Sequence, residues 1–506
     1  MKSFLWHRNA VRMLQNQQQL MCSSAFCRGM AVFIAVLLCS IGAAYSQKPS
    51  VDTLIDMLSK KLPSLSDASF VIRNLDNDSV VAAYNGDVPM NPASVSKLAT
   101  AAAAFEKLGT NYLFKTYAYA DSGSYNPITG QCRGNLYIKA GGDPSLFIER
   151  LWLFVEYLRS SAGLTAINGD IVLDDSFFDT VTTIPFFNNE VASNPYATPV
   201  NALSANFNCV TVYVRPGDSV GAPAVVRIFP DPDSTFQIQS TAYTGESGSE
   251  NTCKVSTEKH GSVTRILVAG SVPAGSMGTT ITRTAWQTWE YAGALLKKLL
   301  RANGVVCAGT VRRGVVPASA ATEKPLYVYQ SPPLCDLVNG MMKYSNNFYA
   351  EMIFKTLSAT ADSGGGSWEK SSHIIQNWWK DRLLPGSPVI VNGSGLGNAN
   401  RLSASQVVAL LCYVWKQKTY MPEYVAALPL AGVDGTLRSR FKGTPLAGAV
   451  RGKTGTLNDL GVCTIAGYVF LPSGSYAYAI LFNTPPTEHS TSNWELQEKI
   501  LEILLP

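Results

Sequence analysis

The stretch PASVSKLATAAAAFEKLG occupies residues 92–109 of the sequence. A proline near its start, an alanine-rich interior and a terminal glycine predict a helix. Small side chains on nearly every face indicate that other elements approach this helix closely, so we expect it to be buried. Ser94 and Lys97 lie three residues apart, a spacing that places both side chains on one face. The lysine amine can therefore reach the serine hydroxyl.

This serine and lysine have the chemistry of a nucleophile and its base. A serine hydroxyl is a weak nucleophile until a base removes its proton, and lysine can be that base when burial or a nearby cation lowers its pKa. Ser94 also lies near the helix N-terminus, where backbone N–H groups and the helix dipole suit the stabilisation of an oxyanion. Ser-x-x-Lys occurs by chance about twice in a chain of this length, so the pattern needs support from other motifs.

Two further polar motifs lie in the C-terminal third. KTG at 453–455, followed by Thr456, comes just before a predicted hairpin, so we expect an edge strand that faces a cleft. Its lysine, its hydroxyls and a glycine that admits close approach suit the binding of a substrate carboxylate and of a peptide backbone. SNN at 345–347 opens a helix, and taken alone it is more typical of a helix cap.

Together and in this order, Ser-x-x-Lys, Ser-x-Asn and Lys-Thr-Gly resemble the motifs of penicillin-binding proteins and serine β-lactamases. Ser345 follows Ser94 by 251 residues, whereas β-lactamases and many transpeptidases have a far shorter spacing. A long insertion there is typical of the D-alanyl-D-alanine carboxypeptidase/endopeptidase family. Three more stretches resemble that family: GGDPSL at 141–146, NGSGL at 392–396 and LPLAGVDGTL at 428–437.

The resemblance implies three catalytic residues. Ser94 would form the acyl-enzyme, Lys97 would accept its proton, and Ser345 would relay a proton to the leaving D-alanine amine. The oxyanion hole would consist of the backbone N–H groups of Ser94 and Thr456. Asn346 stands where the commoner superfamily pattern has Asp, a position that tolerates Asn.

The resemblance also implies the substrate-binding residues Asn347, Lys453, Thr454, Gly455 and Thr456. Asn347 would hold the substrate amide and the catalytic lysine. Lys453 would supply positive potential, which also helps to keep the catalytic lysine neutral. Thr454 and Thr456 would bind the terminal carboxylate.

The implied architecture is α+β. A β-lactamase/transpeptidase-like catalytic domain, an antiparallel sheet flanked by helices, would consist of residues 47–117 and 322–506. Residues 118–321 contain short alternating runs broken by Gly, Pro, Asp and Ser, and they would form two inserted β-rich domains, one nested in the other. Helices are predicted at 285–303, 335–357, 368–383 and 403–415, and strands at 69–73, 79–84, 464–471 and 476–483.

Residues 1–46 predict a signal peptide. Four basic residues and no acidic ones accompany an apolar run at 30–44, and small residues precede Gln47. The run is shorter than the roughly 20 residues of a membrane-spanning helix. We therefore expect cleavage, no stable membrane span, and a periplasmic or cell-envelope location. Without the leader, 37 Lys and Arg face 36 Asp and Glu, a balance that gives no reason to expect nucleic acid.

Other candidate sites are weakly supported. The seven cysteines after residue 46 have no C-x-x-C spacing, and the three histidines there form no H-E-x-x-H motif, so we expect no metal or cofactor. The segment 392–396 is not a G-x-S-x-G elbow because Asn392 replaces the first glycine, and we expect a loop at the edge of the cleft. A tryptophan cluster at 368–379 is more typical of helix packing than of sugar stacking.

These features predict acyl transfer. Ser94 would attack a D-Ala-D-Ala carbonyl in a peptidoglycan stem peptide, D-alanine would leave, and water would hydrolyse the ester. An endopeptidase reaction would cut D-alanyl cross-links by the same chemistry, and β-lactam antibiotics would acylate the serine. Two alternatives remain: a serine β-lactamase, which needs fast deacylation, and a silent protein that only binds peptidoglycan. The complete set of nucleophile and base argues against the second.

Overall fold

The computed structural model describes residues 51–62, 64–187, 193–361, 364–486 and 490–505. The chain divides into two compact units, residues 1–53 and 54–506, and the three motifs lie in the second. The predicted signal peptide lies outside the described residues. Within them, no helix combines the length and the apolar character needed to cross a membrane.

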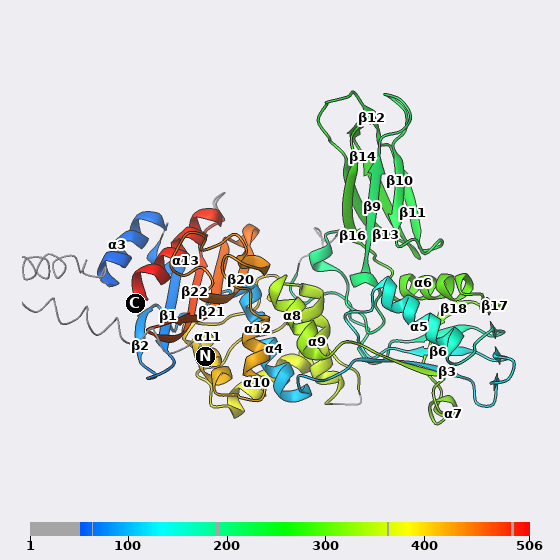
Figure 1. The fold of residues 1–506 in the computed structure, drawn as a ribbon, viewed down its shortest axis with the longest axis horizontal. Coiled ribbons are helices and arrows are strands. Elements are labelled where there is room, and N and C mark those ends of the chain that lie inside the picture. The colour runs from blue at the N-terminus through cyan, green and yellow to red at the C-terminus, as the bar shows by residue number, and fades with distance from the viewer. Residues whose placement is uncertain (1–50, 63, 188–192, 362–363, 487–489, 506) are drawn as a thin grey trace, which may run out of the picture. The chain divides into compact units, whose positions relative to one another are not determined.

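One antiparallel sheet joins the two ends of the described chain. Its strand order is β2-β1-β22-β21-β20, and the N-terminal strands lie beside the C-terminal ones (Figure 1). Phe70 of β1 pairs with Ile480 of β22, which aligns segments about 400 residues apart in sequence. The strands are β1 (Ala68–Asn74), β2 (Val80–Tyr84), β20 (Val450–Leu457), β21 (Val462–Leu471) and β22 (Gly474–Asn483).

Both faces of this sheet are covered, which explains its long apolar strands. Alternate residues of one strand enter different cores: Ile480 and Phe482 pack in one cluster, and Ala479 and Leu481 in another. This follows from the two-residue period of a β-strand. Helix α11 (Ala404–Trp415) packs against β22 and β1, and α13 (Ser490–Leu504) against β21. The predicted α+β class, an antiparallel sheet flanked by helices, is confirmed.

The predicted helix at 92–109 is confirmed, with a tighter first turn. Residues Ala93–Ser96 form the 3₁₀ turn η2, and α4 runs from Lys97 to Leu108. Side chains three residues apart nearly eclipse in a 3₁₀ turn, which brings Lys97 directly over Ser94. The helix is surrounded by other helices, as its small side chains predict. These are α8 (Leu334–Lys343), α9 (Asn347–Ala359) and α10 (Trp368–Asp381).

The segment between the first two motifs contains two kinds of sheet. A mixed sheet has the order β18-β8-β6-β3-β19, and its pairs β6–β8 and β8–β18 are parallel. Two helices pack on each other beside it, α5 (Ile148–Ser160) and α6 (Thr288–Ala302). Its strands are β3 (Lys115–Ala120), β6 (Leu136–Lys139), β8 (Ile171–Asp174), β18 (Val311–Arg313) and β19 (Tyr327–Gln330). The division of the chain at 117/118 and 321/322 stays a prediction.

A second part of this segment is built from strands alone. Three small sheets have the orders β10-β9-β16, β11-β14-β13 and β12-β15, and they enclose their own apolar cluster around Val212 and Ile266. The strands are β9 (Cys209–Arg215), β10 (Val225–Phe229), β11 (Phe236–Ser240), β12 (Tyr243–Gly245), β13 (Lys254–His260), β14 (Val263–Ala269), β15 (Ser271–Pro273) and β16 (Thr279–Thr284).

Candidate active site

Ser94 and Lys97 are in direct contact at the start of α4. Lys97 Nζ lies 2.7 Å from Ser94 Oγ, 2.7 Å from Asn347 Oδ1 and 2.8 Å from the carbonyl oxygen of Ser394. The lysine side chain is fully buried. Burial lowers the pKa of Lys97 to about 7, although the Glu351 carboxylate acts in the opposite direction. A substantial fraction of the lysine is therefore neutral near pH 7.

The two carbonyl contacts determine where the neutral amine points. An uncharged lysine has two N–H donors and one lone pair. The oxygens of Asn347 and Ser394 accept the two N–H groups, which leaves the lone pair for Ser94. The arrangement can thus take the proton of the serine hydroxyl, which is the task of a general base.

Ser345 and Lys453 form a second pair. Lys453 Nζ lies 2.8 Å from Ser345 Oγ and 2.6 Å from the carbonyl oxygen of Thr454. Burial lowers the pKa of Lys453 well below its usual range, and the charge of Lys97 lowers it further. Two buried lysines near one another are costly to protonate together. A substrate carboxylate bound in the cleft would reduce this cost, because its negative charge would offset the positive charge of the lysines.

The turn between α8 and α9 positions the Ser-x-Asn motif. Asn346 caps α9, because its Oδ1 accepts a hydrogen bond from the backbone N–H of Tyr349 at 3.0 Å. Ser345 adopts a left-handed backbone with φ of 56°. The cap interpretation thus holds for Asn346, while its two neighbours, Ser345 and Asn347, line the cleft.

The Lys-Thr-Gly motif lies on β20, the edge strand of the sheet, as predicted. Lys453 and Gly455 are buried, whereas Thr456 is exposed. The hydroxyl of Thr454, which was predicted to bind a carboxylate, donates to Thr436 Oγ1 at 2.7 Å. Gly455 permits close contact with the turn that carries Ser94, since an added Cβ would lie 2.9 Å from both Ala93 Cβ and the Pro92 carbonyl oxygen.

A cleft of about 660 Å³ opens over these residues. Four of the eight predicted residues line it: Ser94, Ser345, Asn347 and Thr456. Three others are buried near the cleft: Lys97, Lys453 and Gly455. The eighth, Thr454, directs its hydroxyl to Thr436. The remaining lining residues are Phe186, Phe187, Tyr196, Leu396, Gly397, Asn398, Leu457, Asn458, Asp459 and Leu460.

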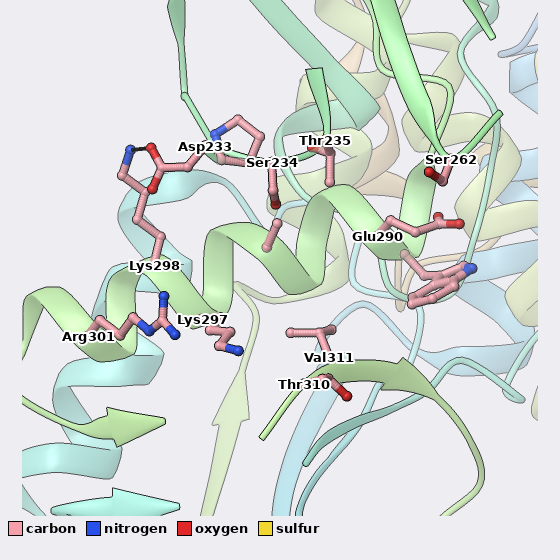
Figure 2. A pocket seen from close by; sticks show the side chains of 13 residues that line it. Asp233, Ser234, Thr235, Ser262, Glu290, Lys297, Lys298, Arg301, Thr310 and Val311 are labelled. Atoms are coloured by element: carbon pink, nitrogen blue, oxygen red, sulfur yellow. Dashed lines mark hydrogen bonds and ion pairs between the residues drawn. The ribbon is translucent and has the colours of Figure 1, made fainter. Parts of the chain in front are cut away.

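A second cavity, of about 510 Å³, lies on α6 and contains none of the predicted catalytic or binding residues. Figure 2 shows Thr235 and Ser262 on one side of the helix and Thr310 on the other. Its Lys298 already pairs with Asp233 at 2.6 Å.

In the part of the chain that the structure describes, the other candidate sites from the sequence are not formed. The tryptophans Trp368, Trp378 and Trp379 are buried in helix packing, as predicted. Among the described residues, no three His, Cys, Asp or Glu side chains are grouped to hold a metal ion.

Comparison with known proteins supports the same assignment. Residues 51–500 match the D-Ala-D-Ala carboxypeptidase 3 (S13) family. The chain belongs to this family. It is 32% identical over 415 residues to a D-alanyl-D-alanine carboxypeptidase of Actinomadura sp. (strain R39), with 79% of this chain and 74% of that protein covered. The sequence-based assignment to the carboxypeptidase/endopeptidase family is confirmed.

Two Haemophilus influenzae comparisons extend this result to the fold. The D-alanyl-D-alanine carboxypeptidase DacB is 26% identical over 433 residues, which cover 85% of this chain and 88% of that protein. The crystal structure of penicillin binding protein 4 from the same organism superposes with a TM-score of 0.76 at 25% identity, covering 88% of this chain and 98% of that one.

Three features of the site in this S13 family member were not predicted from its sequence. The carbonyl of Ser394 contacts Lys97, so the expected loop at the cleft edge also reaches this lysine. Tyr196, from the segment between the first two motifs, lines the cleft. Glu351 is buried behind the site. A signal for Glu351 exists, because Asn347, Glu351 and Lys355 recur every four residues on α9 with only apolar or aromatic residues between them.

Proposed function

We propose that this S13 family member is a serine-type D-alanyl-D-alanine carboxypeptidase that acts on peptidoglycan stem peptides through an acyl-enzyme on Ser94. DD-endopeptidase cleavage of D-alanyl cross-links would use the same groups. The observation that carries the proposal is the 2.7 Å contact between Ser94 Oγ and a buried Lys97 whose pKa is lowered to about 7. After cleavage of the signal peptide, the mature enzyme would act in the periplasm or cell envelope.

In the proposed reaction, Ser94 Oγ forms a bond to the carbonyl carbon of the penultimate D-alanine, and its proton passes to Lys97 Nζ. The backbone N–H groups of Ser94 and Thr456 would stabilise the negative charge that develops on the carbonyl oxygen. The C–N bond breaks, and terminal D-alanine leaves once its amine gains a proton through the Ser345 hydroxyl, which in turn would receive the proton that Lys97 took. Water then hydrolyses the ester, which restores the serine hydroxyl and releases the shortened peptide.

Ser345 is suited to deliver the proton to the leaving amine. Its Oγ accepts a hydrogen bond from Lys453 at 2.8 Å, so its own proton is free to point into the cleft. Lys453 would bind the terminal carboxylate mainly through charge, because its ammonium is buried beneath the cleft surface. Thr456, on the same strand, is exposed and lines the cleft. The role of Thr454 would be indirect unless its contact to Thr436 breaks.

A structural comparison supports β-lactam acylation as part of this proposal. Penicillin binding protein 4 from Haemophilus influenzae has been crystallised with a β-lactam and shares this fold, with a TM-score of 0.70. A β-lactam presents a strained amide beside a carboxylate, and the same nucleophile and cationic groups would receive it.

The test is the intact mass of the purified chain after incubation with benzylpenicillin. Ser96→Ala is the matched control for Ser94→Ala, because Ser96 lies in the same turn but is buried and accepts a hydrogen bond from Asn400. A stable adduct on wild type and on Ser96→Ala, but not on Ser94→Ala, is expected. An adduct that disappears within seconds would indicate a β-lactamase.

A second assay addresses the peptide reaction. Release of D-alanine from an acylated tripeptide ending in D-Ala-D-Ala measures carboxypeptidase activity, and cleavage of a cross-linked peptide dimer measures endopeptidase activity. Both should stop in Ser94→Ala. Binding of peptidoglycan with no hydrolysis by the wild type would overturn the proposal in favour of a silent binding protein.

A further inference from the structure

Glu351 is a fully buried carboxylate on α9, one helical turn beyond Asn347. Three donors converge on it. Its Oε1 accepts the backbone N–H of Ser394 at 2.9 Å, and its Oε2 accepts the backbone N–H of Gly393 at 3.0 Å and the indole N–H of Trp368 at 2.7 Å. Buried charges are retained where such hydrogen bonds stabilise them.

Two of these donors belong to the loop 392–396, whose position is closely defined. Ser394 is held on both sides, since its N–H donates to Glu351 and its carbonyl accepts from Lys97 at 2.8 Å. Gly393 is packed against α9, because an added Cβ would lie 2.5 Å from the Ala350 carbonyl oxygen. A shift of the loop would therefore move the carbonyl that contacts the lysine.

We propose that Glu351 is a positioning residue for acylation: its carboxylate holds the 392–396 loop so that the Ser394 carbonyl occupies one N–H of Lys97 and directs the amine lone pair at Ser94. The inference rests on the proposed function, in which Lys97 is the base. Asn347 occupies the other N–H. Without a fixed Ser394 carbonyl, the amine can rotate, and the fraction of lysines aligned with the serine falls.

The charge of Glu351 has a second effect on the same lysine. It raises the pKa of Lys97 and partly offsets the lowering by burial. Three other charged residues lie in this region. Lys453 is coupled to Lys97 by like charge, and Lys355 interacts with Glu351 and pairs with Asp179 at 2.7 Å. Loss of the Glu351 charge alone should therefore lower the pKa of Lys97.

The test compares Glu351→Gln, Glu351→Asp and Thr100→Val in the rate of benzylpenicillin adduct formation on Ser94 as a function of pH. Gln keeps one acceptor oxygen but turns an N–H₂ group toward a loop N–H, and it has no charge. Asp keeps the charge but shortens the reach. Thr100→Val is the control, because Thr100 Oγ1 also holds the loop, at the Gly393 carbonyl (2.9 Å), without any charge.

We expect Glu351→Gln to slow acylation about 100-fold at its optimum and to move the acid limb of the profile to lower pH. Glu351→Asp should slow acylation while the acid limb stays near its wild-type position. If Glu351→Gln does not fold, Glu351→Asp is the variant that tests the inference. Thr100→Val should lose at most about threefold, with an unmoved limb. The inference would be overturned if Glu351→Gln kept the wild-type acylation rate and acid limb. It would also be overturned if Glu351→Asp kept the wild-type acylation rate. A wild type without a Ser94 adduct would instead overturn the proposed function.

Discussion

The side-chain amide of Asn347 donates a hydrogen bond to the backbone carbonyl of Tyr196 at 2.9 Å, although 151 residues separate them in sequence. Its Oδ1 at the same time accepts from Lys97 at 2.7 Å. One side chain thus connects the lysine to η4 (Pro195–Ala197), in the segment between the first two motifs. The amide cannot reverse without losing both contacts, so its orientation is determined.

Asn347→Asp should make acylation less effective at neutral pH. The new carboxylate would lie beside the Lys97 ammonium and raise its pKa above the present value of about 7. It would also place an acceptor against the Tyr196 carbonyl. We expect the acid limb of benzylpenicillin acylation to move to higher pH and the rate at pH 7 to fall about tenfold or more. Asn346→Asp, which keeps the helix cap, should behave like wild type, and an unmoved limb in Asn347→Asp would contradict the prediction.

The wild-type enzyme should itself show an acid limb near pH 7. A protonated Lys97 has no lone pair, so acylation is slow below the pKa and increases as the pH rises through about 7. Intact-mass measurements of the adduct after quenching at set times, between about pH 5 and 9, give the pH profile of acylation. Lys97→Arg remains charged throughout this range and should lose about 1,000-fold at every pH. A flat wild-type profile would show that another group removes the proton.

Gly455→Ala should disrupt the site more than the fold. A Cβ at this position would lie 2.3 Å from Thr464 Oγ1 and 2.9 Å from Ala93 Cβ, so β20 must move away from the turn that carries Ser94. We expect acylation to fall about 100-fold and the free energy of unfolding to drop by about 1–3 kcal/mol. Adduct kinetics and urea denaturation measure the two effects. Gly340→Ala on α8, where the nearest atom is a Tyr349 ring carbon at 3.2 Å, is the control and should retain acylation.

Asp179→Ala should destabilise the protein through Lys355. The Lys355 side chain is fully buried, pairs with Asp179 at 2.7 Å and lies over the Trp368 ring, 4.2 Å from its centroid. Removal of the carboxylate leaves a buried ammonium without this partner, at a cost of about 3 kcal/mol in the free energy of unfolding. Urea denaturation should show this loss.

Two controls distinguish a buried charge from a lost contact. Lys355→Met added to Asp179→Ala should recover most of the stability, because a buried apolar side chain needs no counterion. Asp56→Ala removes an exposed pair with Lys60 and should cost at most about 1 kcal/mol. Equal losses from Asp179→Ala and Asp56→Ala would contradict the explanation.

The sequence predicted the elements whose signals are local. The helix at 92–109, the edge strand with Lys453 and the C-terminal hairpin all follow from short-range patterns of Gly, Pro and apolar residues. Helix α5 was not predicted in a region expected to be β-rich. Its buried residues Leu151, Phe154, Val155 and Leu158 nevertheless recur at helical spacing, so the signal was present.

By itself, the sequence determined the family and the chemical identity of the candidate site, because the order and spacing of three short motifs are properties of the chain. Only the tertiary structure decided how the Lys97 amine is oriented. The Ser394 carbonyl is a backbone group that any residue would carry, and the Tyr196 contact joins segments 151 residues apart. The lowered pKa of Lys97 likewise depends on burial by several elements at once, which no local pattern specifies.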